Sequence, residues 1–411
     1  MESRHITIVG AGQSGLQLGI GLLDSGYDVT LVSNRTPEQI RAGSIASSQC
    51  MFNAALGHER ILGLDLWNDA PLVEGISFTV APPEAHGVKA MSWAHRLDAP
   101  AQSIDQRVKF PAFMEVFEAR GGKLLFEDAG IAELERYAET SSMVLVAAGK
   151  GEIAQLFDRD NERSTYGAPQ RALALTYVHG MAPREEFSAV NFNLIPGVGE
   201  YFVFPALTVT GPCEIMVFEG LPSSDMDSWK GLSPREHLEN SLRILRTYLP
   251  WEAERCSAVE LTDPHGVLQG RFPPTVRHPL ATLPSGNTVL GMADVVVLND
   301  PITGQGSNNA AKCAASYLGG IIAQGDGAYD DEFKRSLFEE YFSYARHVAD
   351  WTNTMLAPPA PHALNILGAA QGNPEIAKRF ANGFDYPPDF EQWFLSEQGA
   401  ADYLASFSPV R

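Results

Sequence analysis

The opening segment of the chain limits its fold more than any other feature. A run rich in β-branched residues, Ile6-Thr7-Ile8-Val9, leads directly into Gly10-Ala11-Gly12-Gln13-Ser14-Gly15. Apolar residues at helical spacing continue to Ser25-Gly26, and Asp28-Val29-Thr30-Leu31-Val32 then predicts a second strand. A strand, a glycine turn, a helix and a strand within about thirty residues indicate a βαβ unit of the kind that binds a dinucleotide.

Each glycine of this turn has a physical role. Gly10 permits the tight turn from strand to helix, Gly12 lets the backbone approach a pyrophosphate, and Gly15 lets the helix pack closely on the strand. The helix N-terminus at Gln13 and Ser14 offers free N–H groups and the positive end of a dipole. The turn alone leaves FAD and NAD open.

The second predicted strand ends without the acidic residue that commonly holds a ribose hydroxyl. Ser33-Asn34-Arg35 stands there instead, and this departure weakens an NAD interpretation in particular. Arg35 either contacts a phosphate or the adenine of the cofactor or is a solvent-exposed charge.

A second glycine loop stands far along the chain, in Asp300-Pro301-Ile302-Thr303-Gly304-Gln305-Gly306-Ser307-Asn308-Asn309. It opens a helical segment, so backbone N–H groups and the helix dipole are aimed at the N1–O2 edge of a flavin, where negative charge gathers on reduction. Asp294, at the end of the preceding strand, can accept a hydrogen bond from a ribitol hydroxyl. The two loops together favour FAD.

The rest of the chain alternates between sequence patterns typical of strands and patterns typical of helices. Residues 142–149 predict a buried strand parallel to the first two. From 167 to 280, alternating runs separated by Gly/Pro turns indicate an antiparallel sheet with one helix at 234–249. Helical patterns fill 310–356, and a Pro-rich break at 358–361 introduces a C-terminal cap.

The expected fold class is therefore α/β with domains that are discontinuous in sequence. An FAD-binding domain is expected over 1–75, 100–165 and 281–356, a substrate-binding sheet domain over 76–99 and 166–280, and a helical cap over 357–411.

Composition limits the partners of the chain. Fifty acidic residues against thirty basic ones give a net charge of −20, which repels nucleic acid and anionic lipid. The four cysteines form no CxxC pair and the ten histidines show no metal-site spacing, so no metal is expected. Since there is neither a signal-peptide core nor an apolar stretch of about 18 residues, we expect a cytoplasmic protein without a membrane span.

Taken together, these motifs resemble the para-hydroxybenzoate-hydroxylase-like flavoprotein monooxygenases over nearly the whole chain. The resemblance implies a glutathione-reductase-type Rossmann FAD domain, an antiparallel-sheet substrate domain and C-terminal helices. It implies that Gly10, Gly12 and Gly15 hold the pyrophosphate and Asp294 the ribitol. The residues implied around the isoalloxazine are Pro301, Gly304, Gln305, Gly306, Ser307 and Asn308. Arg107 stands where such proteins often place a cofactor contact; the alternative is a surface charge.

Single-component members of that superfamily carry an Asp-Gly motif after a strand in the middle of the chain. The matching strand ends here in Ala147-Ala148-Gly149-Lys150-Gly151, and no such pair follows. Because no second nucleotide fingerprint is present either, FAD is expected to arrive as FADH2 from a separate NAD(P)H:flavin reductase.

More specifically, the chain resembles the two-component (group E) styrene and indole monooxygenases over its full length. The segments that carry this resemblance are Ile8-Val9-Gly10-Ala11-Gly12, Ala119-Arg120-Gly121-Gly122-Lys123, Pro169-Gln170-Arg171-Ala172-Leu173, Asp300-Pro301, Gly304-Gln305-Gly306 and Phe384-Asp385-Tyr386-Pro387. Ser47-Ser48-Gln49-Cys50-Met51-Phe52 resembles the indole branch, because the styrene branch has Asn, Val and His where this chain has Ser47, Gln49 and Met51.

Three further positions separate the two branches: Val73, Ile76 and Ala101 replace a Tyr, a His and a Ser of the styrene branch. Gln49 could exchange a hydrogen bond with a heteroaromatic N–H, while Met51, Val73 and Ile76 are expected to line a flat apolar slot. The alternative for Met51 is a place in the core.

The resemblance implies that reduced FAD and O2 form a C4a-(hydro)peroxyflavin, which epoxidises indole at C2–C3 and also accepts styrene-like alkenes and aryl sulfides. Positioning in a dry site would carry the rate without a side-chain nucleophile. Ser47 and Asn308 are expected to orient the peroxide or the flavin edge. The alternatives are a styrene monooxygenase proper, a single-component NAD(P)H-dependent aromatic hydroxylase and a non-catalytic flavin-binding escort protein. The sequence leaves the oligomeric state open, a homodimer included.

Overall fold

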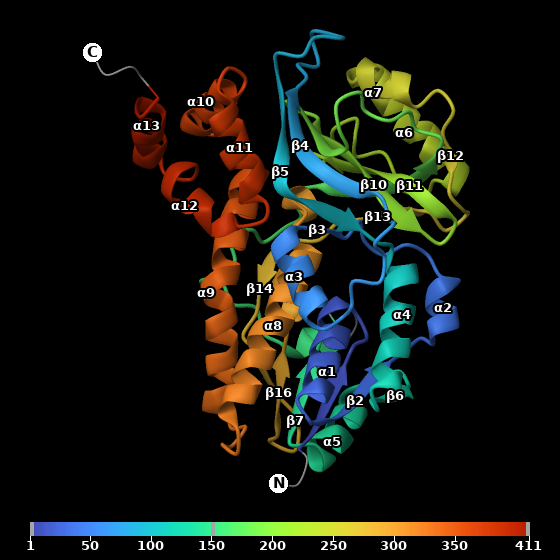
Figure 1. The fold of residues 1–411 in the computed structure, drawn as a ribbon, viewed down its shortest axis with the longest axis vertical. Helices are drawn as coiled ribbons and strands as arrows, with labels where there is room; N and C mark the ends of the chain where they lie inside the picture. Colours follow the sequence, from blue (N-terminus) through green and yellow to red (C-terminus); the bar gives the residue numbers. More distant parts are fainter. Residues whose placement is uncertain (1–3, 149–152, 408–411) are drawn as a thin grey trace.

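The computed structural model describes residues 4–148 and 153–407, which contain a six-stranded sheet and a nine-stranded sheet. Figure 1 shows the six-stranded sheet, hereafter the lower sheet, at the end of the molecule that carries the N-terminus. The nine-stranded sheet, hereafter the upper sheet, lies at the other end, and the C-terminal helices stand beside it. The molecule is therefore built of two sheets joined by segments that cross between them repeatedly.

The lower sheet has the strand order β15-β16-β7-β1-β2-β6. Its strands are β1 (His5–Val9), β2 (Asp28–Ser33), β6 (Lys123–Phe126), β7 (Met143–Val146), β15 (Leu280–Thr282) and β16 (Thr288–Gly291). The pairs from β16 to β6 are parallel, and only β15 joins antiparallel. Strand β1 is buried and rich in β-branched residues, as expected for a strand of a parallel sheet that helices cover on both faces. The strand predicted over 142–149 is confirmed as β7.

The upper sheet follows the path β12-β8-β11-β10-β9-β4-β5-β3, with β13 paired to β8. Its strands are β3 (Cys50–Met51), β4 (Leu72–Val80), β5 (Met91–Ser103), β8 (Ala172–His179), β9 (Ala189–Ile195), β10 (Gly199–Thr208), β11 (Gly211–Gly220), β12 (Glu260–Leu261) and β13 (Val267–Gly270). Its pairs are antiparallel except β4 with β9. A further pair, β14 (Thr275–Val276) with β17 (Val297–Leu298), stands apart.

The upper sheet reaches further toward the N-terminus than the sequence suggests. The two-residue strand β3 pairs with β5, and β4 begins at Leu72, so β3 and the start of β4 lie within residues 1–75, where only the FAD-binding domain is expected. A two-residue strand carries no alternation that a sequence pattern could reveal.

Helices cover both sheets. They are α1 (Gln13–Asp24), α2 (Pro37–Arg41), α3 (Asn53–Ile61), α4 (Gln106–Ala119), α5 (Ile131–Thr140), α6 (Pro234–Tyr248), α7 (Pro250–Arg255), α8 (Gly306–Gln324), α9 (Asp331–Leu356), α10 (Pro361–Ala370), α11 (Pro374–Gly383), α12 (Phe390–Trp393) and α13 (Glu397–Ala405). The helix predicted over 234–249 is α6. The pattern over 310–356 is two helices, because Gly325 adopts φ 53° and Asp330 caps α9 by accepting from the N–H of Phe333.

Two apolar cores correspond to the two sheets, and a third apolar cluster packs the upper sheet against α6. One packs the lower sheet against α1, α4, α8 and α9. The other packs the upper sheet against the C-terminal helices through aromatic side chains such as Trp351, Phe380 and Phe390. Among the residues that the structure describes, no helix combines the length and apolar character needed to cross a membrane.

Candidate cofactor and substrate site

The nucleotide turn is as tightly packed as its glycines predict. Gly10 adopts φ 122°, and its N–H donates to the carbonyl of Val32 at 2.9 Å. A Cβ on Gly15 would lie 2.0 Å from the carbonyl oxygen of Gly10, whereas a Cβ on Gly12 would meet no heavy atom of the described residues within 4 Å. Gly15 is therefore required for packing, and the space beside Gly12 is open to a bound group.

The second loop is built in the same manner. Asp300 accepts from the N–H of Ile302 at 3.1 Å, Gly304 adopts φ 65°, and α8 begins at Gly306. Within the described ranges, no side chain caps the N-terminus of α1 or of α8. The first-turn N–H groups of both helices are therefore available to an anionic or polar ligand.

The structure brings the two loops together. The Nε2 of Gln17, in the second turn of α1, donates to the carbonyl of Ala311, in the second turn of α8, at 2.9 Å. Asp294 follows β16 at the same edge of the lower sheet, because Gly291 pairs with Val146, which in turn pairs with the last residue of β1. Asp294 is exposed at this edge. Both loops and Asp294 thus border one region.

Buried polar atoms beside the second loop fit a polar ligand. In the described part of the chain, the Oε1 of Gln305 and both amide atoms of Asn309 are buried without a hydrogen-bond partner. Buried polar groups are seldom left unpaired, so a bound group is expected to complete them. Together with the open space at Gly12 and the two uncapped helices, these atoms fit FAD, with its pyrophosphate at α1 and its flavin at α8.

Asn308 is fully engaged by the protein. Its Oδ1 accepts from the N–H of Phe52 at 2.8 Å, and its Nδ2 donates to the carbonyls of Cys50 and Gly304, both at 2.9 Å. The side-chain amide of Asn308 therefore forms hydrogen bonds with the backbone at Cys50 and Phe52, as a neighbouring strand would. Asn308 was expected to orient the flavin edge or the peroxide; its contacts position β3 against the second loop.

A small apolar hollow lies beside this loop. It is lined by Ser48, Cys50, Phe52, Val190, Phe192, Phe202, Phe204, Ile302, Thr303, Gly304 and Phe384. The rings of Phe192 and Phe202 are nearly parallel, at 10° and 5.7 Å between centroids. A slot that combines flat aromatic walls with the Ile302–Gly304 backbone suits a small aromatic ligand next to a flavin.

The phenylalanines of this slot were not among the predicted substrate residues. The sequence pattern places Phe202 and Phe204 on one face of a strand, but it does not say what that face contacts.

The Phe384-Asp385-Tyr386-Pro387 motif lies beside the slot as well: the carbonyl of Phe384 accepts from the Nε2 of Gln305, and the Oδ1 of Asp385 accepts from the N–H of Ala54. This motif ties the second loop and α3 to the C-terminal helices.

Gln49 stands between two residues of the lining, Ser48 and Cys50, with a strained backbone at φ 34°. Its Nε2 donates to the hydroxyl of Tyr177 at 3.0 Å, and that hydroxyl donates to the carbonyl of Ser47 at 2.6 Å. The hydroxyl of Tyr177 has one proton and donates it to the carbonyl of Ser47, so Tyr177 cannot also donate a hydrogen bond to the Oε1 of Gln49. This oxygen is buried and, among the described residues, has no donor.

The other predicted substrate residues divide into two groups. Val73, Ile76 and Ala101 are buried in the same apolar cluster as Cys50 and Phe52, and Ile76 pairs with Val190 of the slot lining. Met51 instead faces away from the slot, where its Sδ accepts from the Nζ of Lys109 at 3.0 Å. Successive residues of a strand point to opposite faces, so Cys50 and Phe52 on the slot place Met51 behind it.

The two predicted arginines differ in environment. Arg35 is exposed at the end of β2. Arg107 is 3% exposed and donates to Asp105 at 2.9 Å, to both oxygens of Asp263 at 3.0 Å and to Thr208 at 3.0 Å. Arg107 is thus not a surface charge, and its donors link α4 to the upper sheet.

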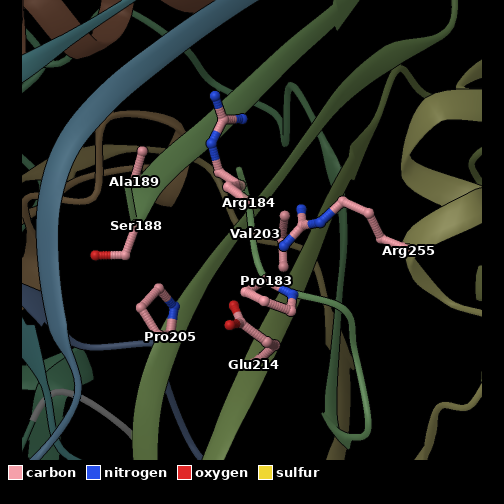
Figure 2. A pocket seen from close by; sticks show the side chains of 8 residues that line it. All are labelled: Pro183, Arg184, Ser188, Ala189, Val203, Pro205, Glu214 and Arg255. Carbon is pink, nitrogen blue, oxygen red and sulfur yellow. The ribbon is translucent and has the colours of Figure 1, made fainter. Parts of the chain in front are cut away.

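A second hollow lies on the other face of the upper sheet. Val203 and Pro205 line it and alternate along β10 with Phe202 and Phe204 of the first slot, so the sheet separates the two. Figure 2 shows its charged lining, in which Arg184 points away from Glu214. Burial raises the pKa of Glu214 to about 7, against the opposing effect of Arg255. The cofactor loops do not reach this hollow.

Known proteins that are similar to this chain include styrene monooxygenases. The family described as "Styrene monooxygenase A putative substrate binding domain" matches residues 149–255. The styrene monooxygenase StyA of Pseudomonas fluorescens is 29% identical over 419 aligned residues, which cover 99% of each chain.

Solved structures show the same fold. A flavoprotein/dehydrogenase from Cytophaga hutchinsonii superposes with a TM-score of 0.71 at 12% identity, covering 98% of each chain. The flavin-dependent brominase Bmp2 gives 0.65 at 14% identity, covering 98% of this chain and 99% of its own. These likenesses concern the fold alone, and they confirm the α/β, para-hydroxybenzoate-hydroxylase-like class.

Proposed function

Because this chain is an FAD-dependent monooxygenase of the styrene monooxygenase family, we propose that it is the oxygenase component of a two-component system and that it epoxidises indole at C2–C3. The proposal includes styrene-like alkenes and aryl sulfides as further substrates. It assigns residues 1–75, 100–165 and 281–356 mainly to FAD, with β3 and the start of β4 belonging to the upper sheet. A cytoplasmic location and a homodimer stay predictions of the sequence.

The buried Oε1 of Gln49 is the observation that favours indole. A buried acceptor without a donor costs about 1–3 kcal/mol, and the pyrrole N–H of indole is a donor, whereas styrene has none. Gln49 is 6% exposed and its other amide end is held by Tyr177, so the acceptor is fixed in place. Gln49 is not itself among the residues that line the slot, so specificity would arise from one polar contact beside the apolar slot.

Reduced FAD, when bound, would supply the oxygen-activating chemistry. The protein contributes the positioning of the substrate and the exclusion of water from the site. Phe192, Phe202 and Phe204 hold a flat ring and exclude water, and Asn308 keeps β3 in place against the second loop. Burial raises the pKa of Cys50 to about 12, so its thiol stays protonated and no nucleophile attacks the epoxide from this side chain.

A separate NAD(P)H:flavin reductase is proposed as the source of FADH2. The support is the missing Asp-Gly motif after β7; positions 149–151 of that segment lie outside the described residues. The nearest alternative substrate is styrene, which is favoured by the name of the relative from Pseudomonas fluorescens.

The test mixes purified protein with chemically reduced FAD, air, and either indole or styrene. We expect oxidised indole in preference to styrene oxide, and blue pigment in bacteria that make indole. Preferential styrene turnover would identify a styrene monooxygenase proper. Unaided oxidation of NADH or NADPH would identify a single-component hydroxylase, and hydrogen peroxide without aromatic product an escort protein.

A further inference from the structure

Lys109 and Glu59 form an ion pair in the interior of the protein. Lys109 lies in α4 and Glu59 in α3, both side chains are 4% exposed, and Nζ and Oε1 are 2.5 Å apart. Removing two charges from water is costly, and their attraction repays it only when further polar contacts complete the pair. The neighbours of this pair therefore indicate what it does.

One neighbour belongs to the nucleotide turn. Gln13 directly follows Gly12, and its Nε2 donates to the Oε1 of Glu59 at 2.7 Å. Its Oε1 accepts from the Nζ of Lys109 at 3.5 Å. Gln13, Glu59 and Lys109 thus close a triangle of contacts at the N-terminus of α1, where the pyrophosphate is expected.

The other neighbour belongs to the substrate slot. The Nζ of Lys109 also donates to the Sδ of Met51, and Met51 lies between Cys50 and Phe52, which line the slot. Phe52 is held from its opposite side by Asn308 of the second loop. The segment 50–52 is therefore fixed both by the second loop and, through Lys109, by the nucleotide turn.

We propose that Lys109 is a positioning residue that couples FAD binding at the nucleotide turn to the shape of the aromatic slot, so that FAD and the aromatic ligand bind cooperatively. An anion bound at α1 immobilises Gln13 and attracts the ammonium group, and the triangle then holds Met51 and the segment 50–52 in one arrangement. Coupling of this kind requires an element whose contacts differ between the two states. The inference rests on the proposed function, because it takes FAD and a small aromatic molecule as the two ligands.

The experiment measures the dissociation constant of indole by calorimetry, without and with saturating oxidised FAD, so no turnover is needed. For the wild-type protein we expect FAD to tighten indole binding about fivefold or more. In Lys109→Met the ratio of the two constants should fall to within about twofold of one. Lys109→Arg should keep part of the effect. The Lys109→Met/Glu59→Gln double variant removes both charges, so it is measured in case the single variant does not fold.

Lys378→Met is the control, because Lys378 forms an exposed ion pair with Asp98 on the surface and should leave the ratio unchanged. A wild-type ratio of one, or an unchanged ratio in Lys109→Met and in the double variant, would overturn the inference. If the wild-type protein binds no indole in either state, the proposed function fails together with this inference. If indole binds but the ratio does not depend on Lys109, only the inference fails.

Discussion

The backbone N–H of Phe52 donates to the Oδ1 of Asn308 at 2.8 Å, across 256 positions of the chain. One side chain of the second glycine loop therefore holds the strand that forms a wall of the aromatic slot. The loop expected to receive the flavin and the slot expected to receive the substrate form one hydrogen-bonded unit.

Replacing Asn308 should break this unit. Asn308→Leu leaves the N–H of Phe52 and the carbonyl of Cys50 unpaired in the interior, so we expect the free energy of unfolding to fall by about 2–4 kcal/mol. Chemical denaturation of the FAD-free protein measures it. Asn309→Leu is the matched control: it removes an amide without partners among the described residues, and it should leave the stability of the FAD-free protein unchanged or higher.

Substitutions at two glycines of the nucleotide turn should separate the effect on packing from the effect on cofactor binding. Gly15→Val should lower both thermal stability and FAD affinity, because its Cβ meets the carbonyl oxygen of Gly10. Gly12→Val should keep the melting temperature of the FAD-free protein while weakening FAD binding at least tenfold, about 1.4 kcal/mol, because only the cofactor needs that space. Quenching of FAD fluorescence reports the affinity. Normal FAD affinity in Gly12→Val would contradict this placement of the pyrophosphate.

Gln49→Val should change substrate preference without changing the cofactor. Losing the acceptor for the indole N–H is expected to lower kcat/KM for indole about three- to tenfold relative to styrene, in line with one hydrogen bond. Styrene turnover serves as the internal control, and FAD affinity should stay within twofold. Equal losses for both substrates would remove Gln49 from the specificity argument.

Arg107→Met distinguishes a structural role from a cofactor contact. Because it leaves Asp105 and Asp263 without their buried partner, stability should fall by about 3–5 kcal/mol. FAD affinity of the folded protein should be little changed. Arg35→Ala is the companion variant, since exposed Arg35 can be removed without loss of stability. If Arg107→Met instead lost FAD and kept its stability, the cofactor contact suggested by the resemblance would be correct.

Stability should fall as the pH rises above about 4.5, because the buried carboxyl of Glu219 lies beside Asp300 of the second loop. Among the described residues, both oxygens of Glu219 and the Oδ2 of Asp300 are buried without a hydrogen-bond donor. Burial first, and the nearby Asp300 second, raise the pKa of Glu219 well above 4.5. The folded protein then holds a proton that the unfolded chain releases above pH 4.5, so this stability is lost as the pH rises toward the folded pKa.

The expected contribution of Glu219 is about 1.4 kcal/mol per pH unit, measured by urea denaturation from about pH 5 upward as the difference between the wild-type protein and Glu219→Gln. Glu214 is present in both proteins, so its own raised pKa cancels in this difference. Glu219→Gln keeps a donor for Asp300 without a titrating proton, so its stability should fall less steeply with pH than that of the wild-type protein. Parallel curves for the two proteins would show that Glu219 is not the group that titrates.

Much of the architecture could be predicted because it depends on near neighbours in the chain. The βαβ unit, the strand at β7 and the helix α6 follow from short-range periodicity and turn chemistry. The break between α8 and α9 and the two-residue strand β3 were not predicted. The break depends on one glycine and one capping side chain, and β3 exists only because β5 and Asn308 pair with it.

The sequence by itself determined the nucleotide turn, since the positive φ of Gly10 and the contact that a Cβ on Gly15 would make with Gly10 are local steric requirements. Only the tertiary structure decided which side of β3 meets the slot. It also decided that Arg107 forms ion pairs with Asp105 and Asp263, and that, among the described residues, the Oε1 of Gln49 has no hydrogen-bond donor. These features depend on partners that stand far away in sequence. Packing of whole elements, and not the pattern of any one segment, brings such groups within hydrogen-bonding distance.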